Sequence, residues 1–268
     1  RGGEGGGGGG GGVVCGGGAE GGTVYALDTG ISSGTPAKVK LNVEGLDKQI
    51  AAAIEANSVT INDMAVNPTS GDVFFSVTED GEGAVIRLST DGKLSEVDTD
   101  EIAHSKVELP NAPEDKVSGE GRRRGNRRMQ SITDLAYVDG KVLVSGLSSS
   151  DSPSTVREIP FPFTGSETGV SLEIYHAAHG RTEDYAPIQT FVPFNIDGEP
   201  NVLAGFTCTP LVKFPIKDLT KTKRIQGTTV AELGNRNRPL DAIVYEKDGK
   251  RFLLMANSAR GVMKISTE

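Results

Sequence analysis

The chain has 268 residues, of which 36% are hydrophobic and 5% aromatic, a composition that suffices for a core divided among many small sheets. Its formal net charge of −8 and its pI near 5.1 argue against a nucleic acid as the main partner. The two cysteines, Cys15 and Cys208, exclude a disulfide framework, and no apolar run approaches the roughly 18 residues that a membrane span needs.

The first part of the chain is almost pure glycine, which loses more backbone entropy on folding than any other residue and offers no side chain to a core. Residues 1–22 are therefore predicted to be disordered or to lack an assignable structure. Two strands are expected next, at 23–27 and 37–43. Residues 46–56 then place an apolar side chain at every fourth position, which predicts a short amphipathic helix packed on the sheets.

A strand, a tight Asp-Gly turn and a second strand form a unit that recurs along the chain. The unit is clearest in residues 131–145 (SITDLAYVDGKVLVS) and recurs at 239–256, and 60–77 is a relative whose two strands flank the turn NPTSG. Residues 190–206 keep the outline but begin with Thr190 where the others have an aspartate. Because Asp-Gly between two β-branched runs is a strong signal for a hairpin, each unit predicts a pair of antiparallel strands.

Four-stranded units that recur every 40 to 55 residues or so are typical of a β-propeller. We therefore expect an all-β domain over residues 23–268, with four-stranded antiparallel blades in a ring of five or six. The C-terminal part of such a ring would lie beyond residue 268. The expected parts are blades at 58–98, 131–176, 187–226 and 237–268, the outer strands of a closing blade at 23–43, and an inserted loop at 100–130.

The repeated units resemble those of six-bladed propellers of the NHL, gluconolactonase-like and YVTN groups. The chain is also similar to a set of uncharacterised exported bacterial propeller proteins. The resemblance covers about residue 22 to the end, and it implies a propeller fold and an exported location, periplasmic or extracellular, without implying an activity. The stretches that carry it are 134–145, 159–163 (IPFPF), 205–214 (GFTCTPLVKF), 232–241 (ELGNRNRPLD) and 257–265 (NSARGVMKI).

Arginines concentrate in loops that a propeller would gather at one mouth of its central channel. Guanidinium groups match carboxylates and phosphates, so these loops are candidates for binding an acidic protein partner or a small anionic ligand. The alternative is a solvated, mobile segment without a ligand. The candidate residues are Arg122, Arg123, Arg124, Arg127, Arg128, Arg181, Arg236, Arg238 and Arg260, together with His179.

Three aspartates begin the inner strands of the repeats: Asp63, Asp134 and Asp241. A short acid at a strand start can accept backbone N–H groups and stabilise the turn, which is the structural interpretation. The same acids could instead supply some of the six to eight oxygen ligands of a Ca²⁺ ion in the channel. A third possibility, implied by the gluconolactonase-like resemblance, is hydrolysis of a lactone or ester assisted by such a metal.

His176 and His179 form the only closely spaced histidine pair. A spacing of three is compatible with a shared metal, and one imidazole could be an axial haem ligand, although no C-x-x-C-H motif is present. A pair at a strand end without any chemistry is the simpler interpretation. Searches for G-x-S-x-G, a P-loop, H-E-x-x-H and an EF-hand loop find no match.

These observations favour a binding or scaffolding propeller that is not an enzyme and that docks its partner at the arginine-bearing loops. Two alternatives from other classes remain open at this point. One is a calcium-dependent hydrolase of the lactonase or esterase type. The other is a subunit of an extracytoplasmic redox assembly, for which the histidine pair is the only indication.

Overall fold

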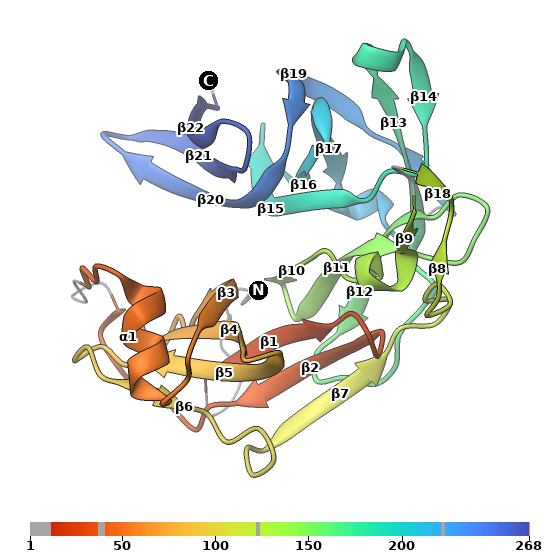
Figure 1. The fold of residues 1–268 in the computed structure, drawn as a ribbon. Helices are drawn as coiled ribbons and strands as arrows, with labels where there is room; N and C mark the ends of the chain where they lie inside the picture. Colours follow the sequence, from red (N-terminus) through yellow and green to blue (C-terminus); the bar gives the residue numbers. More distant parts are fainter. Residues whose placement is uncertain (1–11, 37–40, 122–123, 221–222, 268) are drawn as a thin grey trace. The chain divides into compact units, whose positions relative to one another are not determined.

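The computed structural model describes residues 12–36, 41–121, 124–220 and 223–267, and its regular structure is almost entirely β (Figure 1). Five small sheets of three or more strands account for most of it, which is the blade content of a five-bladed β-propeller and confirms the all-β prediction. No helix in the described parts is long and apolar enough to span a bilayer.

The first sheet differs from the prediction at the N-terminal end. It has the order β1 (Val13–Gly18), β2 (Thr23–Asp28) and β7 (His104–Glu108). Part of the glycine-rich segment, predicted to lack structure, therefore forms a strand, because Val14 and Cys15 are buried there. Part of the expected loop at 100–130 supplies the third strand. Residues 37–40 of the second expected strand lie outside the described residues, and 41–43 are not a strand.

The second sheet contains the strands β3 (Val59–Val66), β4 (Val73–Glu79), β5 (Glu82–Leu88) and β6 (Leu94–Glu96) in that order. Helix α1 (Leu46–Ala53) lies against it, as predicted (Figure 1). Ile50 of the helix is completely buried and belongs to one apolar cluster with Phe75, Val77, Ile86 and Leu88. The helix thus covers an apolar face that the sheet alone would expose.

The third sheet contains β10 (Asp134–Val138), β11 (Lys141–Leu147), β12 (Ser154–Pro160), β13 (Val170–His176) and the short β14 (Arg181–Glu183). A further strand, β18 (Arg224–Gln226), joins it by pairing in parallel with β13. The chain reaches this sheet through a two-stranded ribbon and a 3₁₀ turn. These elements are β8 (Val117–Ser118), β9 (Gly125–Asn126) and η3 (Arg127–Gln130).

The fourth sheet consists of β15 (Ile188–Ile196), β16 (Glu199–Phe206), β17 (Cys208–Pro215) and β19 (Thr228–Asn237). Its last strand lies beyond the predicted boundary at residue 226, because residues 224–226 pair with β13 instead. A fifth sheet follows, made of β20 (Pro239–Lys247), β21 (Lys250–Asn257) and β22 (Gly261–Ser266). The fourth and fifth sheets share one apolar cluster that includes Phe194, Leu203, Leu253 and Met255.

The predicted Asp-Gly turns have the backbone geometry that the residue pair favours. Asp139 and Gly140, between β10 and β11, have φ angles of 46° and 80°. Positive φ at both central residues is the type I′ geometry, which matches the twist of the flanking strands. The same pair of positive φ angles recurs at 80–81, 197–198 and 248–249. The pairs at 197–198 and 248–249 join the first two strands of their sheets as 139–140 does, whereas 80–81 joins β4 to β5.

By their internal contacts the described residues divide into two compact units. The first comprises residues up to 16, 24–106 and 137–140, and the second comprises 17–23, 107–136 and 141–267. The second sheet and helix α1 lie in the first unit. The histidine pair His176 and His179 and the candidate arginines of the sequence analysis that the structure describes lie in the second.

Candidate functional site

The three aspartates expected at strand starts share one local hydrogen bond, although only Asp134 begins its strand: Asp63 lies within β3 and Asp241 is the third residue of β20. Asp63, Asp134 and Asp241 each accept the N–H of the following residue with Oδ1, at 2.8, 2.6 and 2.6 Å. In β3 and β20 this bond accompanies a break in the strand register next to the aspartate. The acid therefore holds the backbone beside a local irregularity of the strand, which agrees with the structural interpretation of these aspartates.

Asp134 has a second role within its unit. It is only 2% exposed, and its Oδ2 accepts the N–H of Phe191 in β15 at 2.6 Å. One carboxylate thus ties the starts of two neighbouring inner strands together through backbone bonds. Both of its oxygens already have donors, which leaves it poorly suited to Ca²⁺. The calcium site remains a prediction, and no group of metal-binding side chains identified among the described residues contains Asp63, Asp134 or Asp241.

The arginine-rich loop contains residues with different roles. Arg128 donates to the carbonyl oxygens of Glu20, Gly21 and Pro113 at 2.9, 3.1 and 2.9 Å, so its guanidinium joins two backbone segments that are distant in sequence. Arg124 and Arg127 are exposed. The other two candidates, at positions 122 and 123, lie outside the described residues. Arg128 is therefore better explained as a structural residue than as a ligand-binding one.

Arg236, Arg238 and Arg260 come together where β19 passes into β20 and where β21 turns into β22. All three are exposed. Arg260 donates from Nη2 to the carbonyl oxygen of Asn235 at 3.0 Å. Its guanidinium lies against Gly234, where an added Cβ would be 2.7 Å from Nη2. We call Arg236, Arg238 and Arg260 the arginine cluster.

Two buried asparagines hold the backbone beneath the arginine cluster. Asn257 donates from its side-chain amide to Oδ1 of Asn237, and its own Oδ1 accepts the N–H groups of Arg238 at 3.3 Å and Ala259 at 3.0 Å. Arg236 has a φ of 63°, a conformation that L residues other than asparagine and aspartate rarely adopt. The backbone that carries the arginines is therefore held by specific side-chain bonds.

The histidine pair lies in a tight hairpin between β13 and β14. His176 ends β13, a 3₁₀ turn carries His179, and Gly180 reverses the chain with a φ of 64°. The pairing sets His176 opposite Arg181 and Ile174 opposite Glu183. Because alternate residues of a strand share a face, His176, Arg181 and Glu183 lie on the same side of the hairpin.

Glu183 is the centre of this cluster. It is 4% exposed, and its Oε2 is 2.9 Å from Nδ1 of His176. Its Oε1 is 2.7 Å from Nδ1 of His179 and accepts Nε–H of Arg181 at 3.0 Å. Arg181 also donates to the hydroxyl of Tyr185 at 3.3 Å. The rings of the two histidines lie side by side, with their centroids 4.1 Å apart.

The hydrogen bonds to Glu183 determine its ionisation. Burial by itself would raise the pKa of this carboxyl, but bonds from Tyr185, His176, Arg181 and His179 stabilise the charged form and lower the pKa to about 2. Glu183 is therefore ionised at any physiological pH. Burial, and next the hydrogen bond to Glu183, raise the pKa of the Tyr185 hydroxyl.

The sequence analysis selected His179 and Arg181 but missed Glu183, which brings them together. The spacing H-x-x-H-x-x-x-E was visible in the sequence and would place the three side chains on one face of an α-helix, but the segment folds as a strand, a 3₁₀ turn and a strand. Only the reversal at Gly180 makes residue 183 a neighbour of residue 176. Three donor atoms from His176, His179 and Glu183 lie within 4.8 Å of one another, and they form the group of potential metal ligands found in the described residues.

Comparisons with known proteins assign no family. No family model matches the chain, and a search of curated proteins found no significant relative. The propeller fold is thus shown by the structure, whereas membership of the NHL, gluconolactonase-like or YVTN groups and an exported location remain predictions.

Proposed function

We propose that this protein is a binding or scaffolding propeller that captures a carboxylate-rich segment of a protein partner on the arginine cluster. The observation that carries the proposal is the exposure of three guanidinium groups on a backbone held by buried asparagines. Among the ion pairs of the described residues, none involves Arg236, Arg238 or Arg260.

The overall charge makes this absence of acidic partners informative. A chain with a net charge of −8 has many carboxylates available, yet these arginines do not pair with them. Guanidinium forks bind carboxylates through two parallel hydrogen bonds, and an arrangement fixed before binding loses less conformational entropy. An acidic partner would be repelled by the rest of the surface, so binding there would depend on the local cluster.

The test compares a triple variant with a control of equal charge change. The probe is a labelled poly-L-glutamate peptide, whose binding is followed by fluorescence anisotropy at low and physiological salt. We expect Arg236→Ser, Arg238→Ser and Arg260→Ser together to weaken binding by about tenfold or more. The control replaces Lys48, Lys93 and Lys106, which are exposed and far from the cluster in sequence, with Ser.

Both triple variants change the net charge by three units, so they share any long-range electrostatic effect. A loss of affinity for the peptide in the arginine variant but not in the lysine control would support a defined docking site. Equal weakening in the two variants, or no weakening in either, would reject the arginine cluster as the contact. A double variant of Arg124 and Arg127 would show whether the arginine-rich loop contributes separately.

A further inference from the structure

The hairpin between β13 and β14 brings together the side-chain types that divalent transition metals prefer. His176, His179 and Glu183 offer two imidazole nitrogens and a carboxylate oxygen within 4.8 Å of one another. Zn²⁺ in particular is bound by histidine nitrogens and carboxylate oxygens. The three residues are held by a short turn rather than by flexible segments, since Gly180 reverses the chain between them.

His176 has one ring nitrogen that nothing in the described protein satisfies. The side chain is 5% exposed, and its Nε2 is buried without a hydrogen-bond partner. Buried polar atoms are almost always paired, so a lone buried nitrogen at a cluster of ligand-type groups indicates a missing ligand. This observation is independent of the spacing of the three side chains.

The ionised carboxylate identifies which nitrogen is available. Glu183 can only accept hydrogen bonds, so Nδ1 of each histidine is assigned as the N–H that donates to it. In a neutral ring this leaves Nε2 with a free lone pair. A carboxylate that holds one ring nitrogen and thereby orients the other is the arrangement that supports metal-bound histidines.

We propose that His176, His179 and Glu183 form a binding site for a divalent transition metal ion, with Zn²⁺ as the representative. His176 and His179 supply the nitrogen ligands, and Glu183 is the carboxylate that orients them and neutralises part of the metal charge. His179 is 45% exposed, which gives an ion a path from solvent. This site is separate from the arginine cluster and goes beyond the proposed partner binding.

Arg181 opposes the metal in this arrangement. Its guanidinium donates to the same carboxylate oxygen that faces Nδ1 of His179, so its positive charge lies beside the proposed site and repels a cation there. The Arg181 side chain is 65% exposed, and it can therefore leave the carboxylate without being buried elsewhere. If the cluster binds a metal, removing Arg181 strengthens binding, whereas a purely structural ion-pair cluster has no such response.

The experiment is isothermal titration of ZnCl₂ into the tag-free, chelator-treated full chain. We expect one Zn²⁺ ion per chain, and a rise in Tm of about 5–10 °C at a free Zn²⁺ concentration a hundredfold above Kd. His179→Ala is expected to weaken binding by about 100-fold, and Glu183→Gln by about 10- to 100-fold. Arg181→Gln is expected to strengthen binding severalfold.

The chain has a matched control in His104, its third histidine, which is exposed and lies in β7. His104→Ala should leave the stoichiometry and the affinity unchanged. Absence of stoichiometric binding to the wild type, or equal binding by the wild type and His179→Ala, would overturn the proposal. A stronger effect of His104→Ala than of His179→Ala would do the same. Because His179 and Arg181 are partly exposed, both variants are expected to fold.

Discussion

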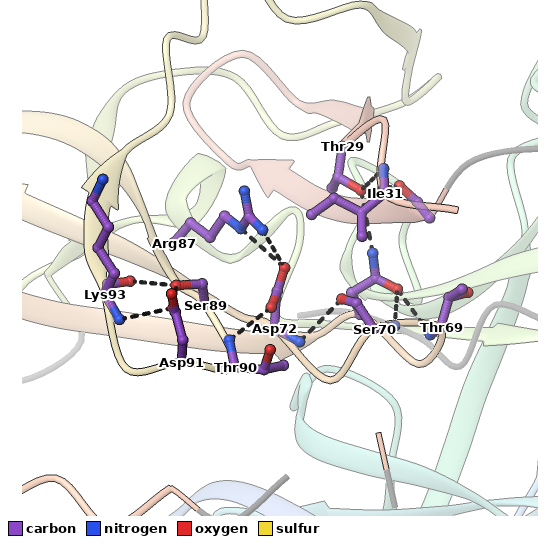
Figure 2. Close-up of polar contacts among 12 residues, drawn as sticks. Thr29, Ile31, Thr69, Ser70, Asp72, Arg87, Ser89, Thr90, Asp91 and Lys93 are labelled. Atoms are coloured by element: carbon purple, nitrogen blue, oxygen red, sulfur yellow. Dashed lines mark hydrogen bonds and ion pairs between the residues drawn. The ribbon is translucent and has the colours of Figure 1, made fainter. Parts of the chain in front are cut away.

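Asp72 and Glu183 are two buried carboxylates in different units, and each is paired with an arginine. Asp72, which is 2% exposed, accepts Nε–H and Nη2–H of Arg87 at 3.0 and 2.7 Å with Oδ2, and the N–H of Thr90 at 3.0 Å with Oδ1 (Figure 2). Glu183, which is 4% exposed, is instead surrounded by two imidazoles and one arginine.

The two carboxylates differ in the chemistry of the groups that donate hydrogen bonds to them. The partners of Asp72 are a guanidinium and a backbone amide, which keep their protons at all ordinary pH values. The loop before it is bonded in the same complete way: Asn67, fully buried, accepts the N–H groups of Thr69 and Ser70, and donates to Thr29. The imidazoles around Glu183 each have a second ring nitrogen that can bind a metal. The buried unpaired Nε2 of His176 therefore distinguishes the surroundings of Glu183 from the fully bonded surroundings of Asp72.

The largest effect is expected from removing the centre of the satisfied network. Asp72→Ala leaves Arg87 without its acid and the N–H of Thr90 without an acceptor. Breaking such a pair from the buried side should lower the free energy of unfolding by about 3 kcal/mol, because Arg87 is 36% exposed and regains some hydration. Urea unfolding measures the loss, which should not depend on added Zn²⁺.

Asp91→Ala is the control in the same region, since Asp91 is an exposed acid that bonds Ser89 and the N–H of Lys93. A much smaller loss is expected there. Equal losses in the two variants would mean that burial of the Asp72–Arg87 pair contributes nothing specific.

A smaller, pH-dependent effect is expected at Glu183. Its folded pKa of about 2 lies below the ordinary 4.5, so the carboxylate stabilises the fold above about pH 4.5, and this contribution disappears as the pH falls towards 2. Glu183→Gln should therefore lose about 2 kcal/mol near neutral pH and nothing near pH 2. The loss in free energy of unfolding is limited because Arg181 and His179 are partly exposed, so water screens their interaction with Glu183.

The measurement is the unfolding free energy of both proteins from pH 7 to pH 2. Other acids titrate in this range, and subtraction of the two curves removes their contribution. Parallel curves would show that the partners of Glu183 do not stabilise its charge.

The smallest expected effect has the opposite sign and concerns a third buried charge. Arg157 in β12 is completely buried, and its Nε and Nη1 have no partner in the described residues. The one hydrogen bond that its side chain makes to the described residues, to the carbonyl oxygen of Pro110, is 3.5 Å long, and burial lowers the pKa of Arg157 to about 10. Arg157→Met should raise the free energy of unfolding by about 1 kcal/mol, because an apolar side chain removes the cost of an unpaired charge.

Arg157→Lys is the comparison, since it keeps a buried charge with a different shape and should lower stability. If Arg157→Met instead lowers the stability, the buried guanidinium has a partner that compensates its charge, as the donors around Glu183 compensate that carboxylate. Thermal unfolding of the wild type and of the two Arg157 variants at one pH measures these differences in stability.

The hairpins and the role of the aspartates were predictable because both depend on residues close in sequence. An Asp-Gly pair needs only its own backbone to adopt positive φ, and Asp63 bonds the N–H of its immediate neighbour. The strand β1 was not predicted, since glycines give no periodic signal, and a partner strand supplies its order. The roles of Arg128 and Arg260 were not predicted either, because the carbonyl groups that they bind carry no sequence signature.

The sequence by itself determined the repeating strand pairs, their turns and hence an all-β propeller, since alternation and turn chemistry act over a few residues. Only the tertiary structure decided which charged side chains are satisfied. It paired Asp72 with Arg87 and gathered His176, His179 and Arg181 around Glu183. Among the described residues, it placed no acid against the buried Arg157. The energy of a charge depends on burial and on partners brought close by folding, and a one-dimensional pattern specifies neither.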